Sequence, residues 1–259
     1  MKRLSPKEKN NILSLLRKGK SLNQISKITN RGKPTIYYYY RKIFDKKFKD
    51  VQIDYNDKLF LGEFIGLFVG DGYCYQDRRS MHYSTRIFLN YTERNYVYKL
   101  KELFNRKFGK APMMYRTRNV LILNYYSKKL FKFNLDYVGW NISRNSLGFN
   151  KKSRTVYLKP RKFSNDFKIG FLRGFIDSDG YISDNKITFD SSSEKIIQQT
   201  KRFLLDMGIK NITLSFRKDK RPNRVGMWKI YLKKSEHKKF INLIQPRNLL
   251  KLKNASAGI

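Results

Sequence analysis

Apolar residues recur at helical spacing in the first part of the chain, just after a helix-start signal. Ser5 is the expected N-cap, Pro6 falls in the first turn, and Glu8 follows the cap by three residues, which is the spacing of a capping box. The apolar positions that follow, up to an expected stop at Gly19, are Ile12, Leu13, Leu15 and Leu16. This pattern predicts a first helix.

Two further short helices are predicted before residue 45. One begins after the cap Ser21, and the other begins at Pro34 or Thr35 and ends at Phe44. The apolar face of the second helix is expected to carry Leu22, Ile25 and Ile28.

Short helices joined by a tight glycine-containing turn resemble a helix-turn-helix, in which the last helix reads DNA. Residues 1–44 are therefore interpreted as a small DNA-binding module, followed by a charged linker at 45–57. The first 50 residues hold 15 basic and 3 acidic side chains, a net charge of +12. An ordinary three-helix interaction module would show the same pattern and remains an alternative. The residues expected to face DNA are Lys33, Thr35, Tyr38, Arg41 and Lys42.

The rest of the chain contains an internal repeat. The segment Leu61–Tyr73 matches Ile169–Tyr181 at an offset of 108 residues. Further matches pair Leu103-Phe104 with Leu204-Leu205 at 101, and Ser127-Lys128-Lys129 with Ser235-Glu236-His237 at 108. Such self-similarity indicates a duplicated domain. Its halves are predicted at residues 58–141 and 166–259, with a linker at 142–165.

Each half is predicted to run helix, strand hairpin, helix, strand pair, helix. This order gives an α+β fold of two pseudo-symmetric αββαββα halves, with each sheet packed on helices by one face and open to DNA on the other. The predicted strand segments are Tyr73–Leu89, Met113–Leu123, Tyr181–Phe189, Ile212–Arg217 and Met227–Leu232.

Small residues at four-residue steps mark the helix that opens each half. Four-residue spacing aligns side chains along one side of a helix, and each glycine there costs roughly 1 kcal/mol relative to alanine. Close parallel packing of the two helices would offset that cost. The small residues are Gly62, Gly66 and Gly70 in one helix and Gly170, Gly174 and Ser178 in the other.

Parallel packing would bring together the last residues of both helices, Asp71 and Asp179. Adjacent carboxylates repel unless they are protonated or bridged by cations. Oxygen ligands and substrate phosphates suit Mg²⁺ or Mn²⁺, which could support one phosphodiester cut per strand.

The charge balance strengthens the nucleic-acid interpretation. Lysine and arginine number 57 against 20 acidic residues, a formal net charge of +37. Phosphate neutralisation is the common reason for such an excess. One cysteine and two histidines exclude a disulfide within the chain and a thiolate zinc cluster. No apolar run reaches the length of a signal or membrane segment, so a soluble intracellular protein is expected.

Two nine-residue segments, Phe64–Gly72 and Leu172–Gly180, resemble the two copies of the LAGLIDADG signature of homing endonucleases. The resemblance covers residues 58–245. It implies a monomer with a saddle-shaped surface that cuts double-stranded DNA across the minor groove, leaves short 3′ overhangs and is often encoded in an intron. It also implies that the metal-binding catalytic acids are Asp71 and Asp179; the preceding Gly70 and Ser178 are counted in the expected metal site.

The two copies of the motif differ. Val69 stands where the family signature has its first aspartate, whereas Asp177 keeps it. Lys229 resembles the basic residue that steadies water near the scissile phosphate, and its counterpart at an offset of 108 is Leu121. We therefore expect unequal sites, with Lys229 as a further catalytic candidate that could also be an ordinary DNA contact.

DNA contacts are expected from polar strand and loop residues of both halves. Those in the first half are Arg78, Arg79, Arg86, Tyr115, Arg116 and Arg118. Those in the second are Lys186, Thr188, Arg217, Lys218, Arg221 and Arg224. Two other functions fit the same scaffold: a catalytically silent DNA-binding regulator, which the two retained acids disfavour, and an RNA maturase acting on intron RNA, which the charge suits equally.

Overall fold

The computed structural model describes residues 4–44, 50–77, 82–141, 152–218, 226–248 and 250–251. The chain forms two compact units, residues 1–50 and 51–259. Within the described residues, no helix is long and apolar enough to cross a membrane.

The smaller unit consists of three helices, as predicted: α1 (Pro6–Arg17), α2 (Leu22–Thr29) and α3 (Lys33–Phe44). Capping boxes begin the first two, because the hydroxyl of Ser5 accepts from the Glu8 amide and that of Ser21 from the Gln24 amide. Four side chains make the centre of its core: Ile12, Leu16, Ile25 and Ile36. Ile28 does not join them, since it is 57% exposed.

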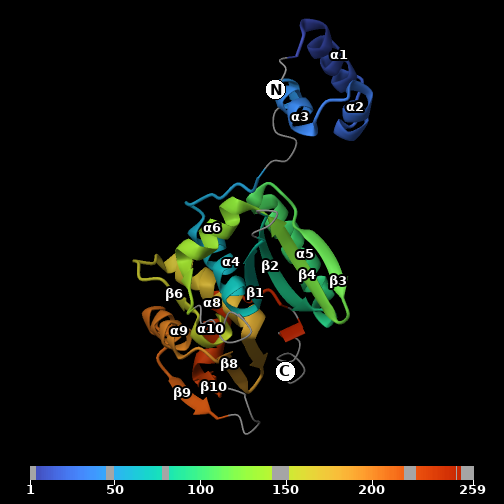
Figure 1. Ribbon diagram of the computed structural model, residues 1–259. Helices are drawn as coiled ribbons and strands as arrows, with labels where there is room; N and C mark the ends of the chain where they lie inside the picture. Colours follow the sequence, from blue (N-terminus) through green and yellow to red (C-terminus); the bar gives the residue numbers. More distant parts are fainter. Residues whose placement is uncertain are drawn as a thin grey trace. The chain divides into compact units, whose positions relative to one another are not determined.

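The larger unit repeats one order of elements twice (Figure 1). The first half comprises α4 (Lys58–Asp71), β1 (Gly72–Gln76), β2 (Tyr83–Asn90), the 3-10 turn η1 (Tyr91–Glu93), α5 (Arg94–Phe108), β3 (Met113–Thr117), β4 (Val120–Tyr126) and α6 (Lys128–Tyr137). The second comprises α8 (Asn165–Asp179), β7 (Gly180–Ser183), β8 (Lys186–Ser191), α9 (Glu194–Asp206), β9 (Ile212–Arg217), β10 (Met227–Leu232) and α10 (Lys234–Ile244). The predicted pair of αββαββα halves is confirmed.

Each half has a four-stranded antiparallel sheet, in the order β1-β2-β4-β3 or β7-β8-β10-β9. The pairing register aligns the halves residue by residue. Gly72 pairs with Ile87 as Gly180 pairs with Phe189, so the first hairpin is shorter in the second half. The final helices α6 and α10 begin after Ser127 and Lys233, an offset of 233 − 127 = 106. Matching Ser127 to Ser235 was therefore wrong by two residues.

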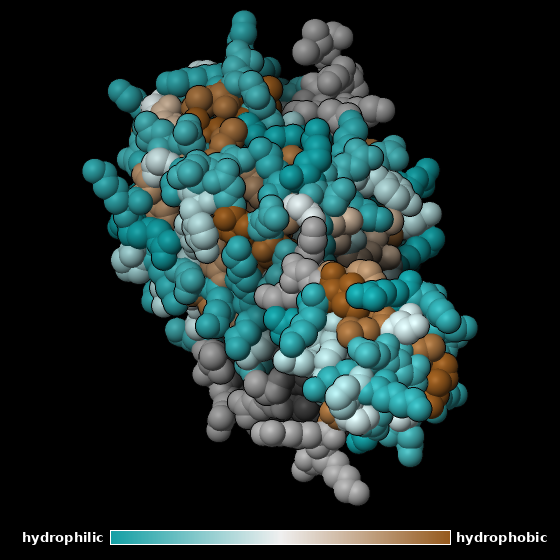
Figure 2. All heavy atoms as spheres, turned by 90° about the horizontal axis from the view of Figure 1, so that it is seen from above, coloured by the Kyte–Doolittle hydropathy of each residue, from teal (hydrophilic) through white to brown (hydrophobic). Residues whose placement is uncertain are grey.

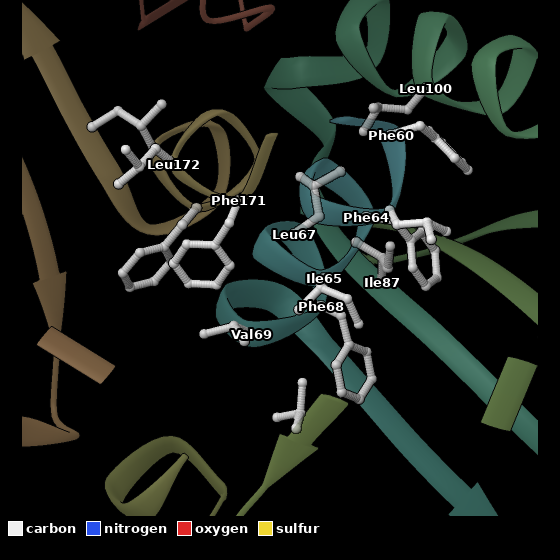
Figure 3. Packing of buried hydrophobic residues seen from close by; sticks show 14 of the residues in the cluster. Phe60, Phe64, Ile65, Leu67, Phe68, Val69, Ile87, Leu100, Phe171 and Leu172 are labelled. Atoms are coloured by element: carbon white, nitrogen blue, oxygen red, sulfur yellow. The ribbon is translucent and has the colours of Figure 1, made fainter. Parts of the chain in front are cut away.

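Helices α4 and α8 lie side by side at the centre of the larger unit, between the two sheets (Figure 1). Residues 60–69 of α4 are all buried, so this helix has no solvent-facing side. In Figure 3, Phe64 and Ile87 point toward each other from α4 and β2, while α8 lies beside α4 on the other side. Each motif helix therefore packs both on its own sheet and on the other half. In the view of Figure 2, hydrophilic side chains cover most of the surface and hydrophobic ones gather only in small groups.

Both segments expected as linkers are partly built into this unit. Val51 and Ile53 are buried, and the Gln52 amide donates to the carbonyl of Phe108 at 2.8 Å. The segment between the halves contains α7 (Lys152–Thr155) and β6 (Tyr157–Leu158), which pairs with β5 (Val138–Gly139). Burial of apolar side chains thus orders stretches that have no periodic pattern.

Candidate active site

The two motif helices contact each other through their glycines. Contacts advance together along both helices, with Gly62 facing Phe167 and Gly66 facing Phe171, so the helices run parallel. An added Cβ atom would lie within 2.3 Å of a backbone oxygen of the facing helix at Gly62, Gly66, Gly170 and Gly174. The predicted seam is confirmed.

This seam brings the acids Asp71 and Asp179 together at the helix ends. Both are the last helical residues before a glycine that opens a strand. A Cβ atom on Gly70 would lie 3.2 Å from the carboxyl carbon of Asp179. Asp71 is half-buried, whereas Asp179 keeps an exposed side. The carboxyl groups are thus close neighbours and remain open to ions.

The closeness of the two carboxyl groups shifts their pKa values. Loss of hydration and repulsion from Asp179 raise the pKa of Asp71 to about 7. Loss of hydration likewise raises the pKa of Asp179, against the opposing charges of Lys152 and Lys251. The exposed side of Asp179 moderates this effect, because water and ions reach its carboxylate.

Two lysines that the sequence did not single out lie beside these acids. Lys152 Nζ donates to the carbonyls of Phe68, Val69 and Gly72 at 2.7–2.8 Å, at the end of α4. Burial lowers the pKa of Lys152 to about 8, although Asp179 and Asp71 act in the opposite direction. No local pattern could have identified it, because it comes from a stretch read as linker.

Lys251 binds the backbone carbonyls at the end of α8. Its Nζ donates to the carbonyls of Ile176, Ser178 and Gly180 at 3.1, 2.5 and 2.8 Å. The carbonyl of Ser178, expected near a metal, therefore already accepts a hydrogen bond from an ammonium group.

Asp177 has a structural role that the sequence also did not reveal. It is fully buried, and its carboxylate accepts from the Arg247 amide at 2.9 Å, the Asn248 amide at 3.1 Å and the Tyr96 hydroxyl at 3.2 Å. Burial raises the pKa of Asp177 to about 6, and the two backbone donors oppose that shift. The second motif therefore anchors the segment after α10.

Lys229 lies on the open face of the second sheet and forms an ion pair with Asp190 at 2.5 Å. The two residues are cross-strand partners in β10 and β8. A cavity of about 300 Å³ adjoins Asp190 and is lined by Val69, Gly70, Ser153, Val156, Asp179, Asp190, Ser191, Ser192 and Met227. Lys229 thus stands near the acid of its own half.

At the equivalent position of the first half, the described strands β2 and β4 carry no ion pair. Ile230 pairs with Phe189 and Leu123 with Ile87, so the register places Ile122 at the position of Lys229. The predicted counterpart, Leu121, was wrong by one residue and points into the core. The partner of Ile122 is Phe88, so apolar side chains replace both members of the ion pair.

The residues expected to contact DNA differ in how exposed their side chains are. Arg86, Tyr115, Arg118, Lys186, Arg217 and Lys218 are exposed or half-exposed. Arg116 instead turns to the helix side at the sheet edge, where its guanidinium stacks 3.7 Å from the centre of the Tyr91 ring. Thr188 is only 1% exposed. Arg78, Arg79, Arg221 and Arg224 lie outside the described residues. In the smaller unit, Lys33, Tyr38, Arg41 and Lys42 are exposed and Thr35 is half-buried.

Exposed tyrosines on the open faces were missed. Tyr73 and Tyr181 follow the two acids directly and are 40% and 45% exposed. Tyr75 is 46% exposed on the same face of β1. Their alternation with buried positions in each strand was visible in the sequence.

The donor set fits a divalent cation. Asp71 and Asp179 offer hard carboxylate oxygens, which match what Mg²⁺ and Mn²⁺ prefer. Across the described part of the chain, no three His, Cys, Asp or Glu residues cluster as a closed metal cage. A cation here would have to share its coordination with water or phosphate.

Comparison with known proteins agrees with this architecture. Residues 166–245 match the family model of the LAGLIDADG-like domain. Solved structures similar to the chain include I-DmoI in complex with DNA and calcium, with 14% identity and a TM-score of 0.53 over 73% of this chain and 90% of that one. Mesophilic variants of the homing endonuclease I-DmoI give 14% identity and a TM-score of 0.52 over 73% and 97%. I-DmoI with DNA and manganese gives 15% and 0.52 over the same shares. No curated protein sequence matched the chain. At these identities the likeness establishes the LAGLIDADG fold.

Proposed function

We propose that this chain is a site-specific endonuclease that hydrolyses one phosphodiester bond in each strand of a DNA duplex, with Mg²⁺ or Mn²⁺ held by Asp71 and Asp179. The observation that carries the proposal is the meeting of two carboxylates from duplicated halves at a glycine seam. Two carboxylates near the carboxyl ends of parallel helices oppose both each other and the helix dipoles, so a structural role for them is unfavourable.

The cation, the two acids and Lys229 have different roles in the proposed reaction. A divalent cation bound to the two acids would supply a Lewis acid that stabilises charge on the phosphate and the leaving 3′ oxygen. Asp71 and Asp179 would bind this cation at the midline between the halves, where its positive charge balances the charge of the reacting phosphate. Lys229, kept in place by Asp190, steadies water or phosphate on the side of the second half.

The halves are proposed to cut at different rates. Lys229 and Asp190 correspond to Ile122 and Phe88, which have no polar atom to orient water. The strand served by the first half should therefore be cut more slowly, and a nicked duplex should accumulate.

The open faces of the two sheets are the proposed DNA surface. Basic side chains there would contact phosphates, and tyrosines such as Tyr73 and Tyr181 offer aromatic contacts next to the cleavage centre. The three-helix unit is proposed to add a helix-turn-helix contact through α3. Cuts across the minor groove with short 3′ overhangs, and action as a monomer, follow from the family resemblance. An intracellular, DNA-containing compartment is the corresponding location.

The test starts with a duplex selected from a randomised library by binding in Ca²⁺. We expect wild type to cut it in Mg²⁺, and Asp71→Asn and Asp179→Asn to bind it in Ca²⁺ without cutting. Asp166→Asn, an exposed acid in the first turn of α8, is the control and should cut normally. Wild type that binds but never cuts would indicate a silent regulator, and splicing of an intron RNA without DNA cleavage would indicate a maturase; either result overturns the proposal.

A further inference from the structure

One arginine on the open face of the first sheet is held by a chain of hydrogen bonds. The Nε of Arg86 donates to the hydroxyl of Ser84 at 3.1 Å, and that hydroxyl donates to Oδ1 of Asn124 at 2.7 Å. Ser84 and Asn124 are 2% and 1% exposed, whereas Arg86 is half-exposed. The two buried side chains therefore form a polar support that fixes the direction of the guanidinium group.

This polar support leaves the binding groups of the arginine free. The Nδ2 of Asn124 has no hydrogen-bond partner among the described residues. A buried donor without an acceptor costs free energy, so the support contributes little to the stability of the fold. What it does is hold Arg86 by Nε alone, and in the described part of the chain no acceptor is bonded to either Nη group. The two Nη groups together form a fork that can bind two acceptors at once.

Arg86 lies in the middle of the open face and close to the cleavage centre. Its strand, β2, is an inner strand between β1 and β4. Its cross-strand partner is Tyr73, two residues after Asp71. Cross-strand neighbours lie about 5 Å apart and two residues of a strand span about 7 Å, so Arg86 is within about 12 Å of Asp71, or about four base pairs. A side chain in the middle of a sheet that enters the major groove faces base edges rather than phosphates.

The equivalent position of the second half carries a covered side chain instead. Tyr181 corresponds to Tyr73 at the repeat offset of 108, and the cross-strand partner of Tyr181 is Thr188, which is 1% exposed. Thr188 pairs on its other side with Tyr231. The Nζ of Lys186 lies 5.7 and 5.4 Å from the ring centres of these two tyrosines. The second sheet therefore buries a short hydroxyl where the first presents a fixed arginine.

We infer that Arg86 reads a guanine in the major groove of the half-site bound by the first sheet, and that the second half does not read the symmetry-related base pair in this way. The arginine fork matches the O6 and N7 acceptors of guanine, a pair that no other base presents in the major groove. The target site is thus asymmetric at this base pair. This inference deepens the proposed endonuclease function and rests on it, because it requires the open sheet faces to bind a DNA duplex.

The test is a base-preference profile of the full chain. A duplex library randomised on both sides of the site centre is selected by binding in Ca²⁺, and the bound fraction is sequenced. Wild type should prefer guanine at one base pair within about four of the centre, with no such preference at the symmetry-related position. Arg86→Lys keeps the charge but loses the fork, so this preference should fall roughly tenfold or more while the preferences elsewhere persist.

Two further variants separate the support from the charge. Ser84→Ala keeps the arginine but removes its acceptor, and it should weaken the same guanine preference severalfold; an unchanged profile would refute the role of the support. Arg217→Lys is the matched control. Arg217 is exposed on the edge strand β9, where a phosphate contact is expected, so its profile should match that of wild type.

The outcomes that overturn the inference are distinct from a failure of the endonuclease function. A profile unchanged by Arg86→Lys, including a uniform loss of affinity over all sequences, would identify Arg86 as a phosphate contact. Equal guanine preferences at the two symmetry-related positions would refute the asymmetry. Because selection in Ca²⁺ requires no cleavage, a wild-type protein that shows the expected profile but never cuts in Mg²⁺ would reject the endonuclease function and still support the assignment of Arg86.

Discussion

Replacing Gly174 with alanine tests the seam on which the site depends. The added methyl carbon would lie 2.0 Å from the carbonyl oxygen of Glu63 and 2.8 Å from the Leu67 amide nitrogen. Ordinary contacts begin near 3.4 Å, so the helices must open locally by about 3.4 − 2.0 = 1.4 Å. No flexible side chain can give way, because the obstructing atoms are backbone.

The expected net effect is a loss of about 3 kcal/mol. Overpacking costs roughly 1–3 kcal/mol where side chains can adjust and more where they cannot. Alanine's better helix propensity returns only about 1 kcal/mol. Displacing Glu63 also strains its buried ion pair with Arg173, which spans the two helices at 3.3 Å. For a unit of this size, the loss corresponds to a Tm lower by roughly 6–12 °C.

Tryptophan fluorescence is the suitable assay, because both tryptophans, Trp140 and Trp228, belong to the larger unit. Gly139→Ala is the control: the atoms in its way belong to the end of the Tyr157 side chain, which can rotate, so a loss under about 1 kcal/mol is expected. A Gly174→Ala protein as stable as wild type would refute the close-packed seam. Cleavage by the folded fraction should also fall, because Asp71 and Asp179 would be spread apart.

Three further predictions follow from the same geometry. Lys229→Met should slow cutting of one strand at least tenfold and leave the other nearly unchanged, measured with a separate label on each strand; equal slowing of both would contradict the assignment of Lys229 to one half. Deleting residues 1–50 should shorten the footprint and weaken DNA binding while Asp71-dependent cutting persists at higher protein concentration, and a footprint of unchanged length would argue against a DNA-contacting helix-turn-helix. Asp177→Asn should cost about 2–4 kcal/mol by disturbing three buried hydrogen bonds and should expose the segment after α10 to limited proteolysis; a protease-resistant variant of wild-type Tm would refute the anchoring role.

The duplicated halves have diverged at the positions nearest the chemistry. Asp177 and Val69 are equivalent in the two motifs; the aspartate holds a following segment through its side chain, whereas Val69 contributes only its backbone carbonyl, which accepts from Lys152. Lys229 likewise has an apolar equivalent, Ile122. The half with the more complete polar set is also the one that matches the LAGLIDADG-like domain. Symmetry is thus kept in the seam and in the lysines at the two helix ends, and it is lost at the positions of Asp177 and Lys229.

Local sequence patterns were sufficient for the framework. Capping residues and apolar periodicity located the helices of the small unit, and the four-residue spacing of Gly62, Gly66 and Gly70 against their repeat predicted the seam. The seam in turn placed Asp71 beside Asp179. Helix positions and the seam depend on residues that are close in sequence or related by the repeat, so they can be predicted from the sequence alone.

Other features were decided by tertiary structure alone. Lys152 lies 84 and 80 residues from Phe68 and Gly72, whose carbonyls it binds. Lys251 lies 75 and 71 residues from Ile176 and Gly180, and neither lysine belongs to a segment with a periodic pattern. The outward turn of Ile28 and the equivalence of Ile122 with Lys229 likewise required the packing and the strand register. A lone charged residue in an irregular segment carries no record of its partner, because that partner is set by how distant helices and strands fill the core.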